Sequence, residues 1–249
     1  MKKILSLLLV FVMVFALTAC GGDEPAAVDP NAKSEGVMTY AEYAAAELDT
    51  EVVIEAFVQA KQSWWEDKAT VYAQDGEGGY FMYDMACSEE DYALLTEGTK
   101  IKVTGYKGEW AGEVEIMDGT FEIVEGDTWV AEATDVTELL GTDALADHMN
   151  KFVSFKGMTV EPSVDADGNE VAFLYNWDGS GSEGNDLYFN VSLNGETYNF
   201  CVESYLCDNT TDVYNAVEAL NIGDVIDLEG FLYWYEGANP HITAVAAAA

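Results

Sequence analysis

Apolar and polar residues alternate in short runs along most of the chain, and turn sequences separate the runs. Alternation with a period of two predicts half-buried β-strands. A short apolar pattern of helical spacing lies between the third and fourth strand of each half, opened by Ser88 in the first half and by Asn209 or Thr210 in the second. The predicted strands are 51–60, 69–74, 79–85, 97–106 and 113–117, followed by 152–160, 187–193, 196–203, 222–231 and 241–245.

The second half of this plan repeats the first. Residues 97–106 (EGTKIKVTGY) align without gaps to residues 222–231 (IGDVIDLEGF), and both glycines recur. Five strands with a helix between the third and the fourth is the plan of the OB barrel. The pattern therefore predicts a mainly β fold, with two tandem OB-fold-like five-stranded barrels that each carry a short capping helix.

Two further helix starts and one insertion divide the chain. Thr39 followed by Glu42 predicts a capped short helix before the first barrel, and Asp135 opens a similar pattern before the second. We therefore expect OB-like domain 1 over 38–130 and OB-like domain 2 over 131–249. Domain 2 carries an insertion at 161–186, between its first two strands, where an OB barrel frames its ligand face.

The amino terminus has the pattern of an export signal. Two lysines precede an uncharged apolar run over 4–17, which is short for a membrane span. The run ends in Leu17-Thr18-Ala19-Cys20, which resembles the bacterial lipobox. That resemblance implies a signal peptide over 1–19, lipidation of Cys20 (diacylglycerol, palmitate) and an extracytoplasmic location on the bacterial cell membrane. An ordinary secretory signal or a spanning anchor is the alternative. The small and acidic residues of 20–37 predict a flexible tether.

The lipobox, the repeated fourth strand and the tandem plan together resemble the bacterial tandem OB-fold lipoproteins. The resemblance covers about 51–124 and 152–246. It rests on the order and spacing of elements, so it implies the fold rather than an activity.

The charge balance restricts the partners. The chain has 46 Asp and Glu against 10 Lys and no Arg, for a formal net charge of −36. A nucleic-acid groove needs clustered basic side chains, so we expect no nucleic-acid partner. A basic patch on an anionic lipid surface is disfavoured for the same reason.

Aromatic residues gather at the loops that frame the two predicted barrel mouths. Flat rings at such a mouth can stack on a ligand, although aromatic side chains usually serve burial, either at a barrel end or between barrels. The ligand-binding candidates are Trp64, Trp65, Trp110, Tyr233, Trp234 and Tyr235.

Two weaker signals concern metal and disulfide chemistry. Asp165, Asp167 and Asn169 resemble the start of a calcium loop, but Glu170 stands where that loop needs glycine, and a plain hairpin turn is the alternative. Cys201 and Cys207 are close enough in sequence to pair in an oxidising compartment, with free buried thiols as the other interpretation. No cofactor is expected apart from this calcium.

Catalysis has little support. His148 and His241 are the only histidines, and neither belongs to a recognisable nucleophile motif. We therefore expect a membrane-anchored binding or scaffolding module, not an enzyme, that takes a neutral glycan, a peptide or an envelope protein through its barrels. The alternatives are an envelope hydrolase that uses paired carboxylates and a solute-capturing lipoprotein that serves a transporter.

Overall fold

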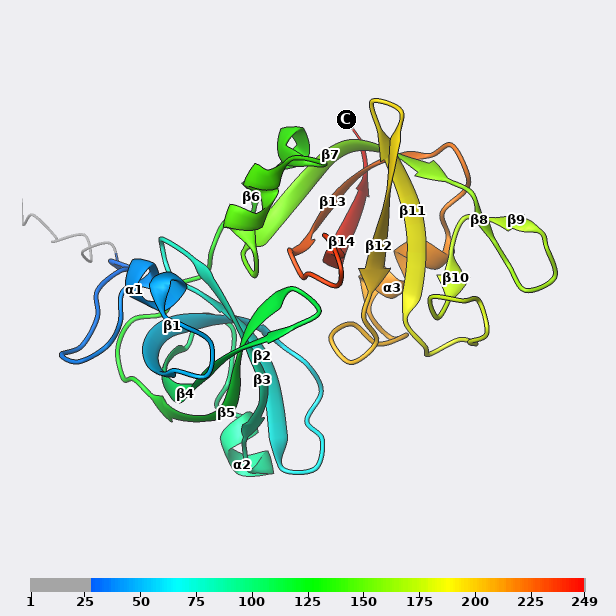
Figure 1. Ribbon diagram of the computed structural model, residues 1–249. Helices are drawn as coiled ribbons and strands as arrows, with labels where there is room; N and C mark the ends of the chain where they lie inside the picture. The colour runs from blue at the N-terminus through cyan, green and yellow to red at the C-terminus, as the bar shows by residue number, and fades with distance from the viewer. Residues whose placement is uncertain (1–27, 249) are drawn as a thin grey trace, which may run out of the picture.

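The computed structural model describes residues 28–248. The expected signal peptide, Cys20 and the first part of the expected tether lie outside the described residues. Two β-barrels stand side by side in Figure 1, the first in blue to green and the second in green to red. Within residues 28–248, no helix combines the length and the apolar character that crossing a membrane requires.

The first barrel closes in the strand order β1-β2-β3-β5-β4. Strand β1 pairs antiparallel with β4 to complete the ring, and β3 pairs parallel with β5. A short helix, α2 (Glu89–Tyr92), lies between β3 and β4. The strands are β1 (Glu51–Lys61), β2 (Lys68–Gln74), β3 (Gly79–Ala86), β4 (Lys100–Trp110) and β5 (Glu113–Ile123).

The second barrel has the same topology. Its ring is closed by pairing of β7 with β11, and β12 pairs parallel with β14. Helix α3 (Asp212–Glu218) again lies between the third and fourth barrel strands. The strands are β7 (Phe152–Glu161), β11 (Leu187–Leu193), β12 (Glu196–Val202), β13 (Val225–Phe231) and β14 (His241–Ala247), with β6 (Thr134–Asp135) and β10 (Leu174–Tyr175) added at the sheet edges. The predicted fold class, two tandem OB-type barrels, is confirmed.

The repeated glycines have a steric reason. Gly98 and Gly223 adopt φ values of +81° and +91°, a left-handed conformation that favours glycine. Gly105 and Gly230 lie at register shifts in β4 and β13. A Cβ on Gly105 would lie 2.6 Å from Ile116 Cγ2. One on Gly230 would clash with the carbonyl oxygen of His241 and would lie 2.7 Å from Ile242 Cα. The motif therefore marks a bulge where the last strand crosses closely over the fourth.

Local capping sets most of the helix starts. The side chain of Thr39 accepts from the backbone N–H of Glu42 in a capping box that opens α1 (Tyr40–Ala45), and Ser88 caps α2. The cap of α3 is Thr211 rather than Asn209 or Thr210. The pattern opened by Asp135 forms two 3-10 helices, η1 (Thr137–Leu139) and η2 (Asp143–His148), in place of one α-helix.

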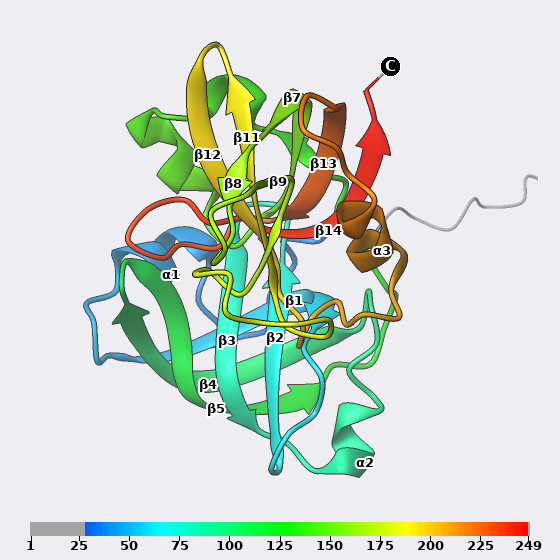
Figure 2. The same ribbon diagram turned by 90° about the vertical axis from the view of Figure 1, so that its right-hand side faces the viewer.

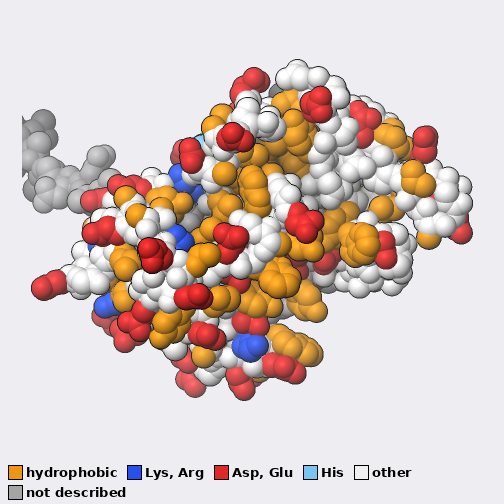
Figure 3. Space-filling model, viewed as in Figure 1, with side chains coloured by type: hydrophobic (Ala, Val, Ile, Leu, Met, Phe, Trp, Pro, Cys, Tyr) orange, Lys and Arg blue, Asp and Glu red, His pale blue; other side chains and the backbone are white. Residues whose placement is uncertain are grey.

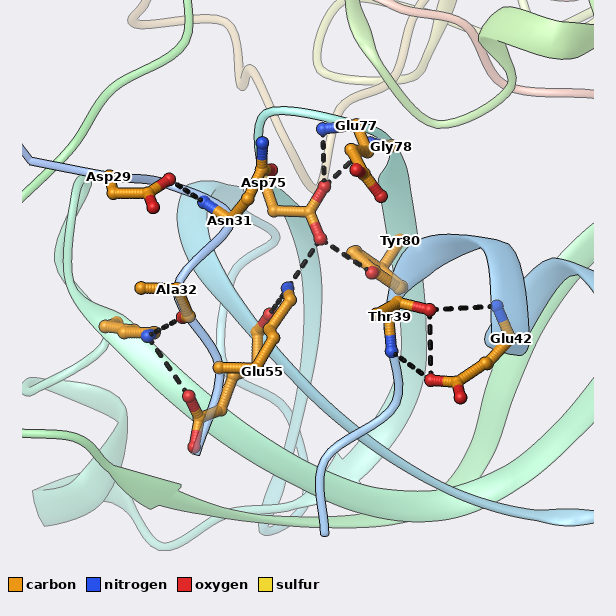
Figure 4. A network of polar contacts seen from close by, with 12 residues as sticks. Asp29, Asn31, Ala32, Thr39, Glu42, Glu55, Asp75, Glu77, Gly78 and Tyr80 are labelled. Atoms are coloured by element: carbon orange, nitrogen blue, oxygen red, sulfur yellow. Dashed lines mark hydrogen bonds and ion pairs between the residues drawn. The ribbon is translucent and has the colours of Figure 1, made fainter. Parts of the chain in front are cut away.

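Residues 29–36 differ from the expected flexible tether, because they lie along the first barrel (Figure 4). The Nζ of Lys33 lies 2.6 Å from a carboxylate oxygen of the buried Asp75 and 2.5 Å from the carbonyl oxygen of Glu55. The backbone N–H of Ser34 donates to the Glu55 side chain, and Lys100 donates to the carbonyl of Ala32. These bonds fix the segment to β1 and to the β2–β3 turn.

The insertion at 161–186 is an extension of the second barrel. Strands β8 (Ser163–Val164) and β9 (Glu170–Val171) form the expected hairpin. The chain then continues through β10, which pairs with the start of β11.

Candidate functional site

A cavity of about 570 Å³ opens on the side of the second barrel. It lies between η1, the end of η2, the middle of β7 and the end of β11. The residues that line it are Asp135, Thr137, Glu138, Leu139, His148, Lys156 and Leu193. We refer to this set as the η1–β7 cleft.

A short hydrogen-bond chain holds η1 against β7. The hydroxyl of Thr137 donates to Asp135 Oδ1 at 2.6 Å, and the Thr137 N–H donates to the same oxygen at 3.0 Å. The Thr137 hydroxyl oxygen in turn accepts the backbone N–H of Lys156 at 2.8 Å. Strand β6 also pairs parallel with β7, so the segment that carries Asp135 and Thr137 is held to β7 by both backbone and side-chain bonds.

A bulge in β7 leaves two successive residues, Lys156 and Gly157, outside the barrel. Phe155 pairs with Leu228 and Met158 pairs with Ile226, so two residues of β7 face one residue of β13. The two unpaired residues are Lys156 and Gly157, and both are exposed. A bulge of this kind re-aims a side chain away from the core. Lys156 forms no ion pair within the part of the chain that the structure describes.

His148 contributes a neutral imidazole to the cleft. Its Nδ1 is buried and has no hydrogen-bond partner among residues 28–248. Burial, and then the charge of Lys151, lower the pKa of His148. The pKa of Asp135 is also lowered, by its bonds to Thr137 and by the charge of Lys156. The cleft therefore presents one cation, two carboxyl side chains and an imidazole with an unused nitrogen.

Three of the six aromatic candidates serve packing. The indole N–H of Trp64 donates to the carbonyl of Cys87 at 2.9 Å. The ring of Tyr233 stacks on His241, with centroids 4.3 Å apart, and meets Phe81 of the first barrel edge-on, with centroids 5.4 Å apart. Trp234 packs against Gly112 of the first barrel, and its backbone N–H donates to Glu113 at 2.8 Å. Tyr233 and Trp234 therefore help to join the barrels, the alternative that the sequence left open.

The other three candidates point into solvent and do not meet in a cavity. Trp65, Trp110 and Tyr235 are 65%, 61% and 53% exposed. None of the six aromatic candidates lines the η1–β7 cleft or the smaller cavity of about 170 Å³ between the barrels. The expected aromatic ligand site at a barrel mouth is not assembled.

The sequence pattern does not identify the residues that join the two barrels. Tyr72 on β2 stacks on Phe231 of β13 at 4.4 Å and 11°, and its hydroxyl lies 3.1 Å from His241 Nδ1. Phe81 on β3 completes this small core. Figure 2 shows the first barrel, with β2 and β3, below the second barrel, with β11 to β14. Burial lowers the pKa of His241 to about 3, so its ring is neutral and structural.

Asp165, Asp167 and Asn169 lie in a plain hairpin turn, the alternative to a calcium loop. The carboxylate of Asp165 accepts the backbone N–H groups of Asp167 and Asn169, as in a capped hairpin turn. No group of three or more His, Cys, Asp or Glu side chains within residues 28–248 is placed to hold a metal ion.

The disulfide hypothesis for Cys201 and Cys207 is also wrong, because both are free and buried, as is Cys87. Phe200 and Val202 point into the core of the second barrel, so Cys201 between them points to the opposite face of the sheet. Cys207 lies in that core. The two thiols are therefore on different sides of β12.

No family model matches the chain, and no curated protein matches it. Solved structures do match in fold. A murine DNA binding protein bound with double-stranded DNA is 12% identical with a TM-score of 0.36, covering 79% of this chain and 96% of that one. The Ifi202 HINa domain in complex with double-stranded DNA is 10% identical with a TM-score of 0.36, covering 81% and 97%. A deletion mutant of the single-stranded DNA binding protein from Thermus aquaticus is 11% identical with a TM-score of 0.26, covering 80% and 94%.

These matches correct two expectations. We expected an anchored module for a glycan, peptide or envelope protein, with a hydrolase or a transporter-serving lipoprotein as alternatives, and no nucleic-acid partner. The matching structures are instead named for DNA binding. The expected function and the expected exclusion of a nucleic-acid partner are therefore withdrawn. At 10–12% identity the likeness is one of fold, so it assigns no partner to this chain.

Proposed function

We propose that the chain binds a small organic molecule in the η1–β7 cleft. The single observation that carries the proposal is the combination in one cavity of Lys156, which has no ion pair in the described chain, the carboxyl groups of Asp135 and Glu138, and two leucines. A volume of about 570 Å³ is within the range of small-molecule sites, which combine apolar walls with a few converging polar groups.

Binding without chemical turnover fits the arrangement of these groups. The hydroxyl in the cleft belongs to Thr137, which donates its proton to Asp135 and accepts from the Lys156 backbone. It is therefore held as a structural bridge, and His148 is not hydrogen-bonded to it as an activating base would be. We propose a binding protein and not an enzyme.

A fragment screen followed by NMR tests the site. Fragments that bind the uniformly labelled mature chain are expected to shift the backbone amide signals of Thr137, Leu139, His148 and Lys156. Signals from β1 to β5 of the first barrel serve as the internal control. If the binding fragments shift signals of the first barrel instead, or if a broad library yields no binder, the cleft is not a ligand site.

We also propose, on the lipobox alone, that Cys20 is acylated and that the barrels lie outside the cytoplasmic membrane. This proposal is independent of the cleft. Expression of the full chain in a bacterium fed an alkyne fatty acid is expected to label it, and Cys20→Ala is expected to abolish the label. Equal labelling of both chains, or recovery of the unlabelled chain with its first residues intact, would contradict it.

A further inference from the structure

We propose that the ligand of the η1–β7 cleft is a small zwitterion, a molecule with one ammonium group, one carboxylate and a short aliphatic portion. This inference rests on the proposed function and specifies its ligand class. It follows from the charges and surfaces that the cleft presents and from the charge of the whole chain.

Lys156 provides the partner for a carboxylate. It is the one cation among the residues that line the cleft. The β7 bulge places its side chain outside the barrel, and it forms no ion pair among residues 28–248. Four other lysines of the described chain already have partners. Lys33, Lys68 and Lys100 form ion pairs with carboxylates, and Lys107 donates to three backbone carbonyls. A carboxylate at Lys156 would gain a charge-assisted hydrogen bond.

The acceptors for an ammonium group lie on the η1 side of the same cleft. Both bonds from Thr137 to Asp135 use Oδ1, which leaves Oδ2 without a hydrogen-bond partner in the described part of the chain. Glu138 is exposed beside it. An ammonium group has three donors, and the carboxylate oxygens of Asp135 and Glu138 provide acceptors for it.

The aliphatic portion of the ligand has a matching surface. Leu139 from η1 and Leu193 from the end of β11 both line the cleft, and both are only partly buried. A short alkyl chain that covers both leucines removes their apolar surface, and its own, from water.

The net charge of −36 argues against a simple ion. Acidic side chains are spread over both barrels (Figure 3). A plain anion would be repelled by this field, and a plain cation would be attracted to many carboxylates without preference for one site. A zwitterion has no net charge, so its binding depends on the local pair of opposite charges, which this cleft supplies.

Titration calorimetry on the mature chain tests the class with matched probes. The probes are L-leucine, isocaproate, which lacks its ammonium group, and isoamylamine, which lacks its carboxylate. Two further zwitterions of different size, glycine and ε-aminocaproate, are tested beside L-leucine. We expect at least one zwitterion to bind at least about tenfold more tightly than both isocaproate and isoamylamine, since a charge-assisted hydrogen bond is worth ~1.5–3 kcal/mol.

Variants assign the contacts. Lys156→Gln is expected to weaken the bound zwitterion about tenfold or more and to leave any residual isoamylamine binding unchanged. Lys102→Gln, the same change on β4 of the first barrel, is the matched control and is expected to change nothing. Circular dichroism and the melting temperature of each variant establish that it is folded.

The outcomes separate the two proposals. If isocaproate or isoamylamine binds as tightly as every zwitterion, or if no probe binds while screened fragments still shift the cleft amides, the zwitterion inference is wrong and the cleft remains a small-molecule site. If neither the probes nor the fragments affect the cleft, the proposed function is wrong as well. Loss of zwitterion binding in Lys102→Gln would also overturn the assignment to Lys156.

Discussion

Glu113 couples the stability of the two-barrel unit to pH. It is completely buried at the start of β5, and its Oε2 accepts the backbone N–H of Trp234 from the second barrel. Its other oxygen, Oε1, and the side-chain oxygen of Asn150 are both buried without a partner in the described chain. Burial raises the pKa of Glu113 to about 8, the charge of Glu115 adds to this rise, and the bond from the Trp234 N–H opposes it.

The direction of the pH effect follows from this raised pKa. Between pH 4.5, the ordinary carboxyl pKa, and pH 8 the folded chain keeps the Glu113 proton while the unfolded chain has lost it. The free energy of unfolding therefore falls as pH rises through this interval, at about 1.4 kcal/mol per pH unit. The total is on the order of 5 kcal/mol as an upper bound. The stabilisation from the protonated Glu113 is fully present below pH 4.5 and is lost above about pH 8.

The variant Glu113→Gln removes the titration and keeps the shape and the acceptor for Trp234. Its amide can also donate to the unpartnered Asn150 oxygen. We expect the variant to equal the parent chain or fall slightly below it in mildly acid solution, and to exceed it by a few kcal/mol in alkaline solution. Urea unfolding across the pH range measures the difference, with the exposed Glu122→Gln on the same strand as the control. A difference between Glu113→Gln and the parent that does not change with pH would refute the reasoning.

Three further changes test the packing described above. Tyr72→Phe keeps the stack on Phe231 but removes the bond to His241, and a loss of ~1–3 kcal/mol is expected in urea unfolding; an unchanged midpoint would contradict the bond. Gly230→Ala places a Cβ against the last strand and is expected to cost ~1–3 kcal/mol or more by the same measurement, whereas a neutral effect would show that the bulge relaxes freely. Lys33→Met breaks the ion pair with Asp75, so hydrogen exchange over residues 29–36 is expected to become faster, and an unchanged exchange rate would show that the pair does not hold the segment.

The barrels could be predicted because their signals are local. Alternation located every barrel strand, and Thr39 and Ser88 mark helix starts that a side-chain bond to the backbone confirms. The start of α3 was misplaced because three polar residues in a row can each act as a cap, and packing of the helix selects Thr211.

The site and the barrel interface could not be predicted because they depend on contacts distant in sequence. Tyr72 alternates with inward residues and would face solvent in a single barrel, but the second barrel buries it. Lys156 follows the inward Phe155 as an ordinary outward residue does, and the pattern does not show that η1 and the end of β11 enclose a cavity beside it. The sequence positions of the aromatic residues indicate that they gather near the barrel loops. They do not show that Tyr233 and Trp234 are buried in packing contacts.

The docking of residues 29–36 on the first barrel limits how far an anchored molecule could extend. If Cys20 carries the lipid, only the residues between it and Asp29 are available as a leash, and their fully stretched length is about 30 Å. The first barrel would then stay within roughly its own diameter of the bilayer surface.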